Sequence, residues 1–330
     1  MTDLSNDGSF RSTASAQILR QRAALLQSLR HFFDSRGMIE VQTPILSQDI
    51  VVDRHLDPLV VEVEDFPPRH GTSHTWYLQT SPEQNMKRLL ASGLEAIYQI
   101  GPVFRSGEFG PFHNPEFTMV EWYRVGEDFE GGITFLEELT THLLATAQPM
   151  RATFAEVFQK HLGIDALESS MDALADVAMA RGHVQDRTWS MDRDDWINLL
   201  FSHDVQPQLG HEKPLVVTHF PATQAALARI ADEDARTAER FEIFYRGVEL
   251  ANGYHELLDP SILRARNAIA NAQRIEDGKT PLPSESRLLD AMESGLPACC
   301  GCALGFDRVV MLATESHSLR DVLCFPWDRA

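Results

Sequence analysis

Apolar residues recur at helical spacing near the start of the chain. Between Ala16 and Arg36 they lie three, four and seven positions apart, and Gly37 follows where a helix would end. The next stretch, MIEVQTPIL, has the composition of a strand, and Pro44 within it is best tolerated at an edge, an end or an interface. A helix and a strand of this kind would leave apolar side chains exposed on the surface of a single chain. We therefore expect a homodimer built on residues 11–45.

Further along, apolar and polar residues alternate with the period of a strand. The run AIYQIGPVFR is rich in β-forming residues, and the segment from Phe117 to Tyr123 alternates two sets of side chains. One set is an ordinary core face, whereas the other places Glu121 and Tyr123 beside two large apolar groups. Gly110-Pro111 is a turn signal between the two runs. We expect two antiparallel strands joined by a long loop.

The segment TWYLQTSPEQNMKRLLAS predicts a strand followed by a helix. Ser81 suits the N-cap, Pro82 the first helical position and Glu83 the first turn. A carboxylate in the first turn interacts favourably with the helix dipole, so Glu83 has a purely structural explanation. Its spacing alone does not identify a functional role.

The rest of the chain predicts helices between strands that are joined as hairpins. Residues 131–147 and most of 154–200 have helical patterns, whereas PLVVTHF, FEIFYRGVELANGYHELL and CALGF are typical of strands. The last strand leads into a helix opened by Asp307. Since regular alternation of strand and helix is missing, the pattern favours an α+β fold with an antiparallel sheet flanked by helices.

Three glutamates lie seven residues apart at Glu242, Glu249 and Glu256. A two-residue turn at Arg246-Gly247 would pair residue 245 with 248 and 242 with 251, which puts Glu249 diagonal to Glu242 on one face, roughly 7–8 Å away. A turn or a bulge at Asn252-Gly253 would return Glu256 to that face. Two such carboxylates repel by about 2 kcal/mol at an effective dielectric constant near 20. Mg²⁺ would relieve this repulsion, although a solvated surface hairpin explains the glutamates equally well.

Composition limits the class of protein. The chain has 330 residues, of which 43% are hydrophobic and 23% charged, and a net charge of −19 disfavours extended binding to nucleic acid. No apolar run near the start resembles a signal peptide or a membrane span, so we expect a cytoplasmic protein. Cys299, Cys300 and Cys302 are crowded together while Cys324 stands alone, which makes a poor disulfide framework. A zinc site would need a fourth ligand at suitable spacing, and none is evident.

Several of these stretches, taken in order, resemble the class II aminoacyl-tRNA synthetases, and the lysyl branch in particular. RGMIEVQTPIL resembles the first class motif, FRSGEFGPFHNPEF the second and ALGFDR the third, and HNPEFTMVEWY and ELANGYHEL are specific to the branch. The likeness runs from about residue 16 to the C-terminus. A catalytic core without an anticodon-binding domain, after a flexible N-terminus at residues 1–14, is similar to the ligases that attach (R)-β-lysine to elongation factor P. In those ligases alanine stands at the position of Ala303, where lysyl-tRNA synthetases have glycine.

The resemblance implies a set of site residues in one catalytic domain, residues 15–330, with the helical segment at about 154–208 inside it. Arg105 and Arg308 would be catalytic, and Glu242 and Glu249 would hold Mg²⁺. ATP would be bound by Arg105, Ser106, Gly107, Glu108, His113, Asn114, Phe117, Glu249, Leu250, Gly305 and Arg308. The amino acid would be bound by Ser81, Pro82, Glu83, Glu121, Tyr123, Asn252, Glu256 and Ala303. A dicationic substrate needs acidic partners once it is desolvated, which gives Glu83 a functional reason as well.

The chain departs from the family at the start of the second motif. The family has Arg-Asn-Glu-Glu there, whereas this chain has Arg105-Ser106-Gly107-Glu108, so contact with the adenine amino group falls to backbone atoms or to Glu108. Two other hypotheses stay open. One is a shortened lysyl-tRNA synthetase that activates α-lysine, against which Ala303 and the acidic charge argue. The other is a catalytically silent regulatory paralogue, against which the retained charged residues of the site argue.

Overall fold

The computed structural model describes residues 10–63, 75–185 and 191–330. The chain forms two compact units, and β6 (Glu116–Val125) runs from the first into the second. The first comprises Met1–Glu121, Asn267–Ser294 and Gly305–Ala330, and the second Trp122–Arg266 and Gly295–Leu304. Of the expected flexible N-terminal segment, residues 1–9 lie outside the described part. The expectation of one catalytic domain over residues 15–330 stays a prediction.

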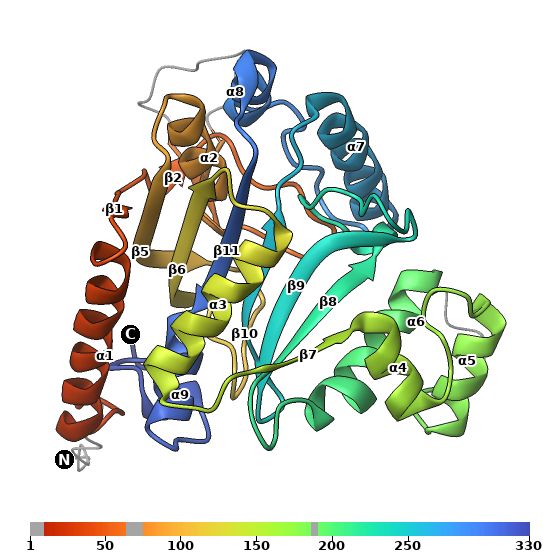
Figure 1. The fold of residues 1–330 in the computed structure, drawn as a ribbon, viewed down its shortest axis with the longest axis horizontal. Helices are drawn as coiled ribbons and strands as arrows, with labels where there is room; N and C mark the ends of the chain where they lie inside the picture. Colours follow the sequence, from red (N-terminus) through yellow and green to blue (C-terminus); the bar gives the residue numbers. More distant parts are fainter. Residues whose placement is uncertain (1–9, 64–74, 186–190) are drawn as a thin grey trace, which may run out of the picture. The chain divides into compact units, whose positions relative to one another are not determined.

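The first unit begins with the expected helix, α1 (Ala16–Asp34). Its start is capped by Ser15, whose Oγ accepts from the Ile18 amide at 3.2 Å, and Gly37 ends the turn with a φ of 72°. Leu29, Phe32 and Phe33 form its buried stripe. In Figure 1, α1 lies beside α9 (Phe306–Ala313), with which it is in contact.

The stretch MIEVQTPIL does not form one continuous strand, which corrects the sequence-based expectation. It yields only β1 (Ile39–Glu40) and β2 (Leu46–Ser47), separated by the segment that contains Pro44. Proline has no amide hydrogen to donate to a neighbouring strand, and this accounts for the break. β1 pairs in parallel with β5 (Ala96–Phe104), whereas β2 joins a small antiparallel sheet of order β2-β4-β3.

The remaining elements of the first unit are two short strands and three helices, two of which extend into the second unit. They are β3 (Val60–Glu62), β4 (Thr75–Leu78), α2 (Glu83–Ala91), and most of α7 (Pro260–Glu276) and α8 (Arg287–Gly295). The large sheet contributes β1, β5 and the first part of β6 to this unit, in that order. The two expected strands joined by a loop are therefore β5 and β6, with residues 105–115 between them.

The second unit holds the other strands and the helical segment expected near residues 154–208. Its strands are β7 (Met150–Thr153), β8 (Leu215–Pro221), β9 (Thr237–Tyr245), β10 (Val248–His255) and β11 (Cys299–Gly305), in the spatial order β11-β10-β9-β8-β7. Its helices are α3 (Phe129–Leu144), α4 (Phe154–Leu162), α5 (Met171–Ala180) and α6 (Arg193–Leu200). Within this unit β7 and β8 pair in parallel, whereas β8–β9, β9–β10 and β10–β11 are antiparallel. The α+β expectation is confirmed.

Helices α4, α5 and α6 gather next to β7 and β8 (Figure 1). They enclose an apolar core that includes Phe154, Phe158, Trp196 and Phe220, all buried. This core explains the apolar pattern of the helical segment without any catalytic function. None of the helices in the described ranges combines the length and the apolar composition needed to cross a membrane.

Candidate active site

The glutamate-rich segment of the second unit is a hairpin formed by β9 and β10. Tyr245 pairs with Val248, so the expected two-residue turn at Arg246-Gly247 is confirmed. Both turn residues have positive φ angles, 52° and 76°, which is the conformation of a type I′ turn. Glu249 pairs with Phe244, and this places Glu249 on the same face as Glu242, as expected.

Beyond Glu249 the register differs from the sequence-based expectation. A bulge lies between Glu249 and Ala251, and as a result Glu242 pairs with Asn252 and not with Ala251. The bulge thus precedes Asn252-Gly253, where the sequence suggested it. The bulge still has the predicted consequence for Glu256. Asn252 lies directly opposite Glu242, and the alternation along β10 then places Glu256 on the same face. Leu250, an expected ATP-binding residue, lies in the bulge and is buried.

Glu242 is ion-paired with an arginine that the sequence-based site did not include. Arg240 donates from Nη2 to Glu242 Oε1 at 2.5 Å, and its guanidinium carbon lies 5.9 Å from the centroid of the Tyr254 ring. Burial lowers the pKa of Arg240, but the charges of Glu242, Tyr254 and Glu249 outweigh burial and raise it. Part of the positive charge expected between the two carboxylates is therefore supplied by the protein.

The two carboxylates still fit a hard divalent cation. Glu242 and Glu249 share one face and offer oxygen ligands, the type that Mg²⁺ takes when phosphate oxygens and water complete its shell. Across the described ranges, no group of three or more histidine, cysteine, aspartate or glutamate side chains could hold a metal ion by itself. A cation at this position would thus depend on ligands from a bound nucleotide.

The neighbouring strand β11 brings Ala303 opposite Asn252, so the two residues share the face of Glu242. Asn252 donates from Nδ2 to the Tyr254 hydroxyl at 3.0 Å. Its Oδ1 atom is buried and has no hydrogen-bond partner in the described part of the chain. Since a buried orphan acceptor is costly, Asn252 is suited to accept a hydrogen bond from a ligand.

Tyr123 and Glu256 lie close together in the second unit, around Gly301 on β11. Both side chains are buried, with 3% and 2% of their surface exposed. Burial, followed by the negative charge of Glu256, raises the pKa of the neighbouring Cys300 thiol well above its ordinary value. The four cysteines, all within the described ranges, form no disulfide.

In the first unit, the expected amine-binding residues lie at the start of α2. Ser81 donates from Oγ to Glu121 Oε2 at 2.7 Å, and the same hydroxyl accepts from the Glu83 amide at 3.0 Å. The helix begins at Glu83 with Pro82 in the cap position, one residue later than expected. The Ser81 hydroxyl nevertheless satisfies an amide of the first turn, as a cap does.

Glu83 forms a buried ion pair with Lys87, one helical turn later. Lys87 Nζ lies 2.5 Å from Glu83 Oε1, and the Lys87 side chain is only 1% exposed. A pair of this kind fixes the carboxylate and offsets its desolvation. Glu83 therefore has a structural partner. A ligand ammonium group that binds Glu83 would share the carboxylate with Lys87.

Arg105 lies at the end of β5, where the loop begins. Its guanidinium carbon lies 5.1 Å from the centroid of the Phe117 ring, its Nε donates to the Thr80 carbonyl at 3.4 Å, and its Nη1 lies 3.7 Å from Glu108 Oε1. These contacts are long. The cation is oriented by several weak partners and is not neutralised by one close carboxylate, which suits a group that binds phosphate.

The far end of the loop contacts α9 through Arg308, which lies in the same unit. Arg308 Nη2 lies 2.9 Å from His113 Nε2, and its Nε donates to the Phe112 carbonyl at 3.2 Å. Gly305 occupies the N-cap position of α9. Asp307 accepts from the Thr118 amide at 2.8 Å and pairs with Arg22, so it anchors α9 to β6 and α1.

Asn114 has a structural role in this loop. Its Nδ2 donates to the Glu116 carbonyl at 2.6 Å, and its Oδ1 accepts from the Trp327 amide at 3.0 Å. Because both amide atoms are used, Asn114 holds the loop against the C-terminal segment. ATP binding by Asn114 was expected and stays a prediction.

Ser106 and Gly107, where the chain departs from the family sequence, are fixed through the backbone. The Ser106 amide donates to the Asp57 carbonyl at 2.7 Å, and Gly107 has a φ of 80°, which favours glycine. The two residues thus provide a tight backbone turn directly after Arg105. Neither residue has a side chain that could replace the carboxylate found in the family.

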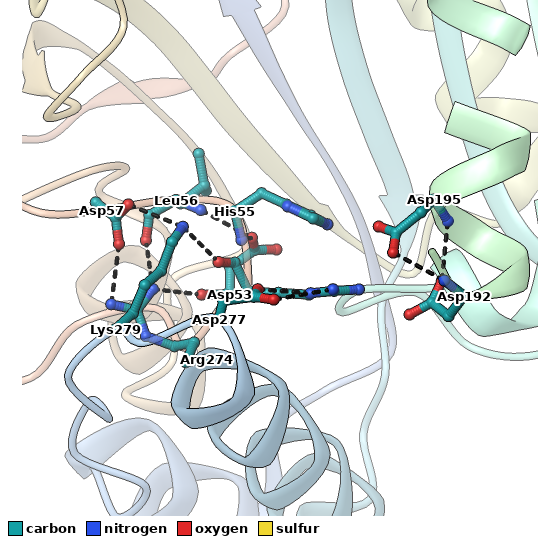
Figure 2. A network of polar contacts seen from close by, with 10 residues as sticks. Asp53, His55, Leu56, Asp57, Asp192, Asp195, Arg274, Asp277 and Lys279 are labelled. Carbon is teal, nitrogen blue, oxygen red and sulfur yellow. Dashed lines mark hydrogen bonds and ion pairs between the residues drawn. The ribbon is translucent and has the colours of Figure 1, made fainter. Parts of the chain in front are cut away.

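The Asp57 carboxylate is held by the end of α7 and the segment after it (Figure 2). Arg274 Nη2 lies 2.9 Å from Oδ1 and Lys279 Nζ lies 2.9 Å from Oδ2. Arg274 also donates to the carbonyls of Asp53 and Leu56 at 2.9 and 3.2 Å, and its side chain is 3% exposed. The segment before Asp57 is thereby fixed, and Asp57 in turn fixes the Ser106 amide.

The structure therefore brings the expected residues together in two sets. The first unit holds a cationic set around the loop, Arg105, His113 and Arg308, together with Ser81, Glu83 and Glu121. The second unit holds Tyr123, Glu242, Glu249, Asn252, Glu256 and Ala303. Sequence reasoning missed four residues that contact expected site residues: Asp57, Lys87, Arg240 and Gly301. Only Lys87 had a sequence signal, its spacing of four from Glu83.

Comparisons with known proteins agree with this geometry. The family described as tRNA synthetases class II (D, K and N) matches residues 8–329. Curated proteins from Salmonella arizonae and Salmonella schwarzengrund, each named elongation factor P–(R)-β-lysine ligase, are 42% identical over 327 residues. The alignment covers 99% of this chain and 100% of each relative. The chain belongs to the class II tRNA synthetase family.

Proposed function

We propose that this protein is a ligase that activates (R)-β-lysine with ATP and transfers it to a lysine side chain of elongation factor P. One observation carries the proposal: similarity to curated ligases of that name extends over the whole of their length at 42% identity. The charged residues that such a reaction requires are present in both units. The fold alone does not decide the substrate, because one fold hosts many activities.

The proposed reaction has two steps. In the first, a carboxylate oxygen of the amino acid attacks the α-phosphorus of ATP, the bond to the β-phosphate oxygen breaks, and pyrophosphate leaves. In the second, the amine of the acceptor lysine attacks the carbonyl carbon, AMP leaves, and the amine gives up a proton. Arg105 stabilises the charge that builds on the α-phosphate, since a fixed cation aimed at a transferring phosphoryl group lowers the barrier.

The cations of the first unit bind the rest of the nucleotide. Arg308 and His113, 2.9 Å apart, hold the outer phosphates, and Phe117 offers its ring to the adenine. Ser106, Gly107 and Glu108 receive the adenine amino group through the backbone or the Glu108 carboxylate.

The acidic residues recognise the two ammonium groups of the substrate. Glu83, Glu121 and Glu256 have exposed fractions of 8%, 2% and 2%. A dication gains more from such carboxylates than a neutral ligand does, because opposite charges attract more strongly where water is excluded. Tyr123 and the orphan Oδ1 atom of Asn252 supply further acceptors.

We include Mg²⁺ in the proposal, held by Glu242 and Glu249. Bound there, it would neutralise the phosphates of ATP during transfer. The protein's own contribution is to keep the two carboxylates on one face with Arg240 beside Glu242.

Two further assignments belong to the proposal. The active form is a homodimer built on residues 11–45. The reaction takes place in the cytoplasm, which agrees with four cysteine thiols that form no disulfide.

The experiment is ATP–pyrophosphate exchange with α-lysine, (R)-β-lysine and (S)-β-lysine, followed by transfer to elongation factor P or to tRNA. The proposal expects exchange to be fastest with (R)-β-lysine and the label to appear on elongation factor P. Preferred exchange with α-lysine and transfer to tRNA would support a shortened lysyl-tRNA synthetase. Absence of exchange with all three amino acids would support a silent paralogue.

A further inference from the structure

Gly301 occupies a buried position in β11, yet its backbone does not require glycine. Its φ angle lies outside the positive region that side chains rarely adopt, whereas eleven other glycines in the described ranges have positive φ. Its strand neighbours Cys300 and Cys302 carry ordinary side chains. The reason for glycine at this position is therefore space.

Two side chains fill that space. A Cβ atom built on Gly301 would lie 2.2 Å from Tyr123 Cε1, 2.4 Å from Tyr123 Cδ1 and 2.6 Å from Glu256 Oε1. Real Cβ atoms essentially never approach other heavy atoms this closely, so one of the two groups would have to move. The phenol ring and the carboxylate must lie close to each other, since both lie within 2.6 Å of one point.

We propose that Gly301 is a positioning residue for substrate recognition: by leaving out a side chain, it lets the Tyr123 phenol and the Glu256 carboxylate converge on one ammonium group. The inference rests on the proposed roles of Tyr123 and Glu256 in the function above. Gly301 itself touches no reacting atom, and it acts through the geometry of the pair.

The position of Gly301 in the sheet agrees with this role. Gly301 pairs with Tyr254, and Ala303 pairs with Asn252, so Gly301 and Ala303 lie on one face of β11. Gly301 thereby leaves space for the phenol and the carboxylate, while the Ala303 methyl group limits the space near the Asn252 amide. One strand would then fix two separate features of the amino-acid pocket.

The test is Gly301→Ala, assayed by ATP–pyrophosphate exchange with separate KM values for the amino acid and for ATP. We expect the KM for the amino acid to rise at least about 10-fold, because overpacking at a filled site displaces its neighbours. The KM for ATP should change less than about 2-fold on the same reasoning. A proportional change in both constants, or no change in either, would overturn the inference.

Gly253→Ala is the matched control. Gly253 lies on β10 and faces the opposite side, where an added Cβ would lie 2.3 Å from Phe241 Cζ in the core. Both variants should lower the melting temperature, but only Gly301→Ala should separate the two KM values. An equal separation in Gly253→Ala would show that overpacking of the sheet is sufficient, and the inference would be wrong.

A double-mutant cycle covers the case in which Gly301→Ala folds poorly. Tyr123→Ala removes the ring that the new methyl group would meet, so Gly301→Ala should have a smaller effect on the amino-acid KM in that background. Equal effects in both backgrounds would contradict the inference. Glu256→Gln and Tyr123→Phe test the underlying function separately: if neither raises the amino-acid KM, the proposed recognition roles fail, whatever the glycine variants show.

Discussion

Arg240 and Glu242 form a partly buried ion pair, with Nη2 and Oε1 at 2.5 Å. A divalent cation that binds Glu242 must therefore share this carboxylate with a guanidinium group. Glu249 lies on the same face, and its charge contributes to the raised pKa of Arg240.

Glu249→Gln should abolish most adenylate formation while the fold stays intact. The substitution removes one negative charge without changing the shape of the side chain, and the loss of a metal ligand should lower kcat by at least about 100-fold. The measurement is ATP–pyrophosphate exchange across a Mg²⁺ titration, with the melting temperature as a check on folding. Glu212→Gln, at an exposed position of the same unit, is the control. Normal exchange at ordinary Mg²⁺ would remove Glu249 from the metal-binding role.

Residues 11–45 should form the dimer interface. Ile39 and Ile45 lie in this region and remain 53% and 39% exposed in the single chain, so both are available to an interface. Ile39→Asp should therefore convert the dimer to a monomer in sedimentation velocity at micromolar concentration. Ile275→Asp places the same charge at a 60% exposed isoleucine of α7 and should leave the dimer unchanged. A wild-type monomer with full activity would contradict the prediction.

The local parts of this structure were readable from the sequence. The apolar spacing of α1 and its Gly37 terminus are properties of neighbouring residues, as is the turn at Arg246-Gly247. The bulge near Leu250 was placed a few residues too late. A bulge on either side of Asn252 returns Glu256 to the same face, so the alternation of side chains could not distinguish the two.

The contacts between distant segments were not readable. Asp57 and Arg274 are far apart in the sequence, and only the folded chain brings the carboxylate and the guanidinium together. Gly301 gave no signal either, because its role depends on what fills the space beside it and not on its own conformation. The resemblance supplied the candidate catalytic residues, and the structure shows which groups contact them.

The Asp57 carboxylate should make stability depend on pH. Partial burial raises its pKa, but the hydrogen bonds from Lys279 and Arg274 outweigh burial and lower the pKa below its ordinary value of 3.8. A carboxyl group whose pKa is lowered on folding stabilises the protein above the unfolded value, and this stabilisation is lost as the pH falls through the folded value. Asp57→Asn should therefore lower the melting temperature at pH 7.

The difference in melting temperature between wild type and Asp57→Asn should start to shrink as the pH falls below about 3.8, and it should vanish below the lower pKa of the folded state, where the wild-type carboxyl is protonated as well. Asp321→Asn, at an exposed position in the same unit, is the control for a general change in charge. A difference that stays constant from pH 7 to pH 3 would show that the contacts of Asp57 contribute through shape alone.

Ala303→Gly should shift substrate choice toward α-lysine. Ala303 lies opposite Asn252 across β10 and β11, so its methyl group occupies space beside the amide proposed to orient the polar part of the amino acid. The isomers differ in the position of one amino group, and a difference of about one methylene in a pocket is worth about 10–200-fold in specificity. In Ala303→Gly, the ratio of kcat/KM for (R)-β-lysine over α-lysine should decrease by about 10–200-fold relative to wild type. Both substrates should still need two ammonium groups, because Glu83, Glu121 and Glu256 are untouched. If the ratio is unchanged while Gly301→Ala raises the amino-acid KM, the pocket recognises charge through Tyr123 and Glu256 but selects the isomer elsewhere.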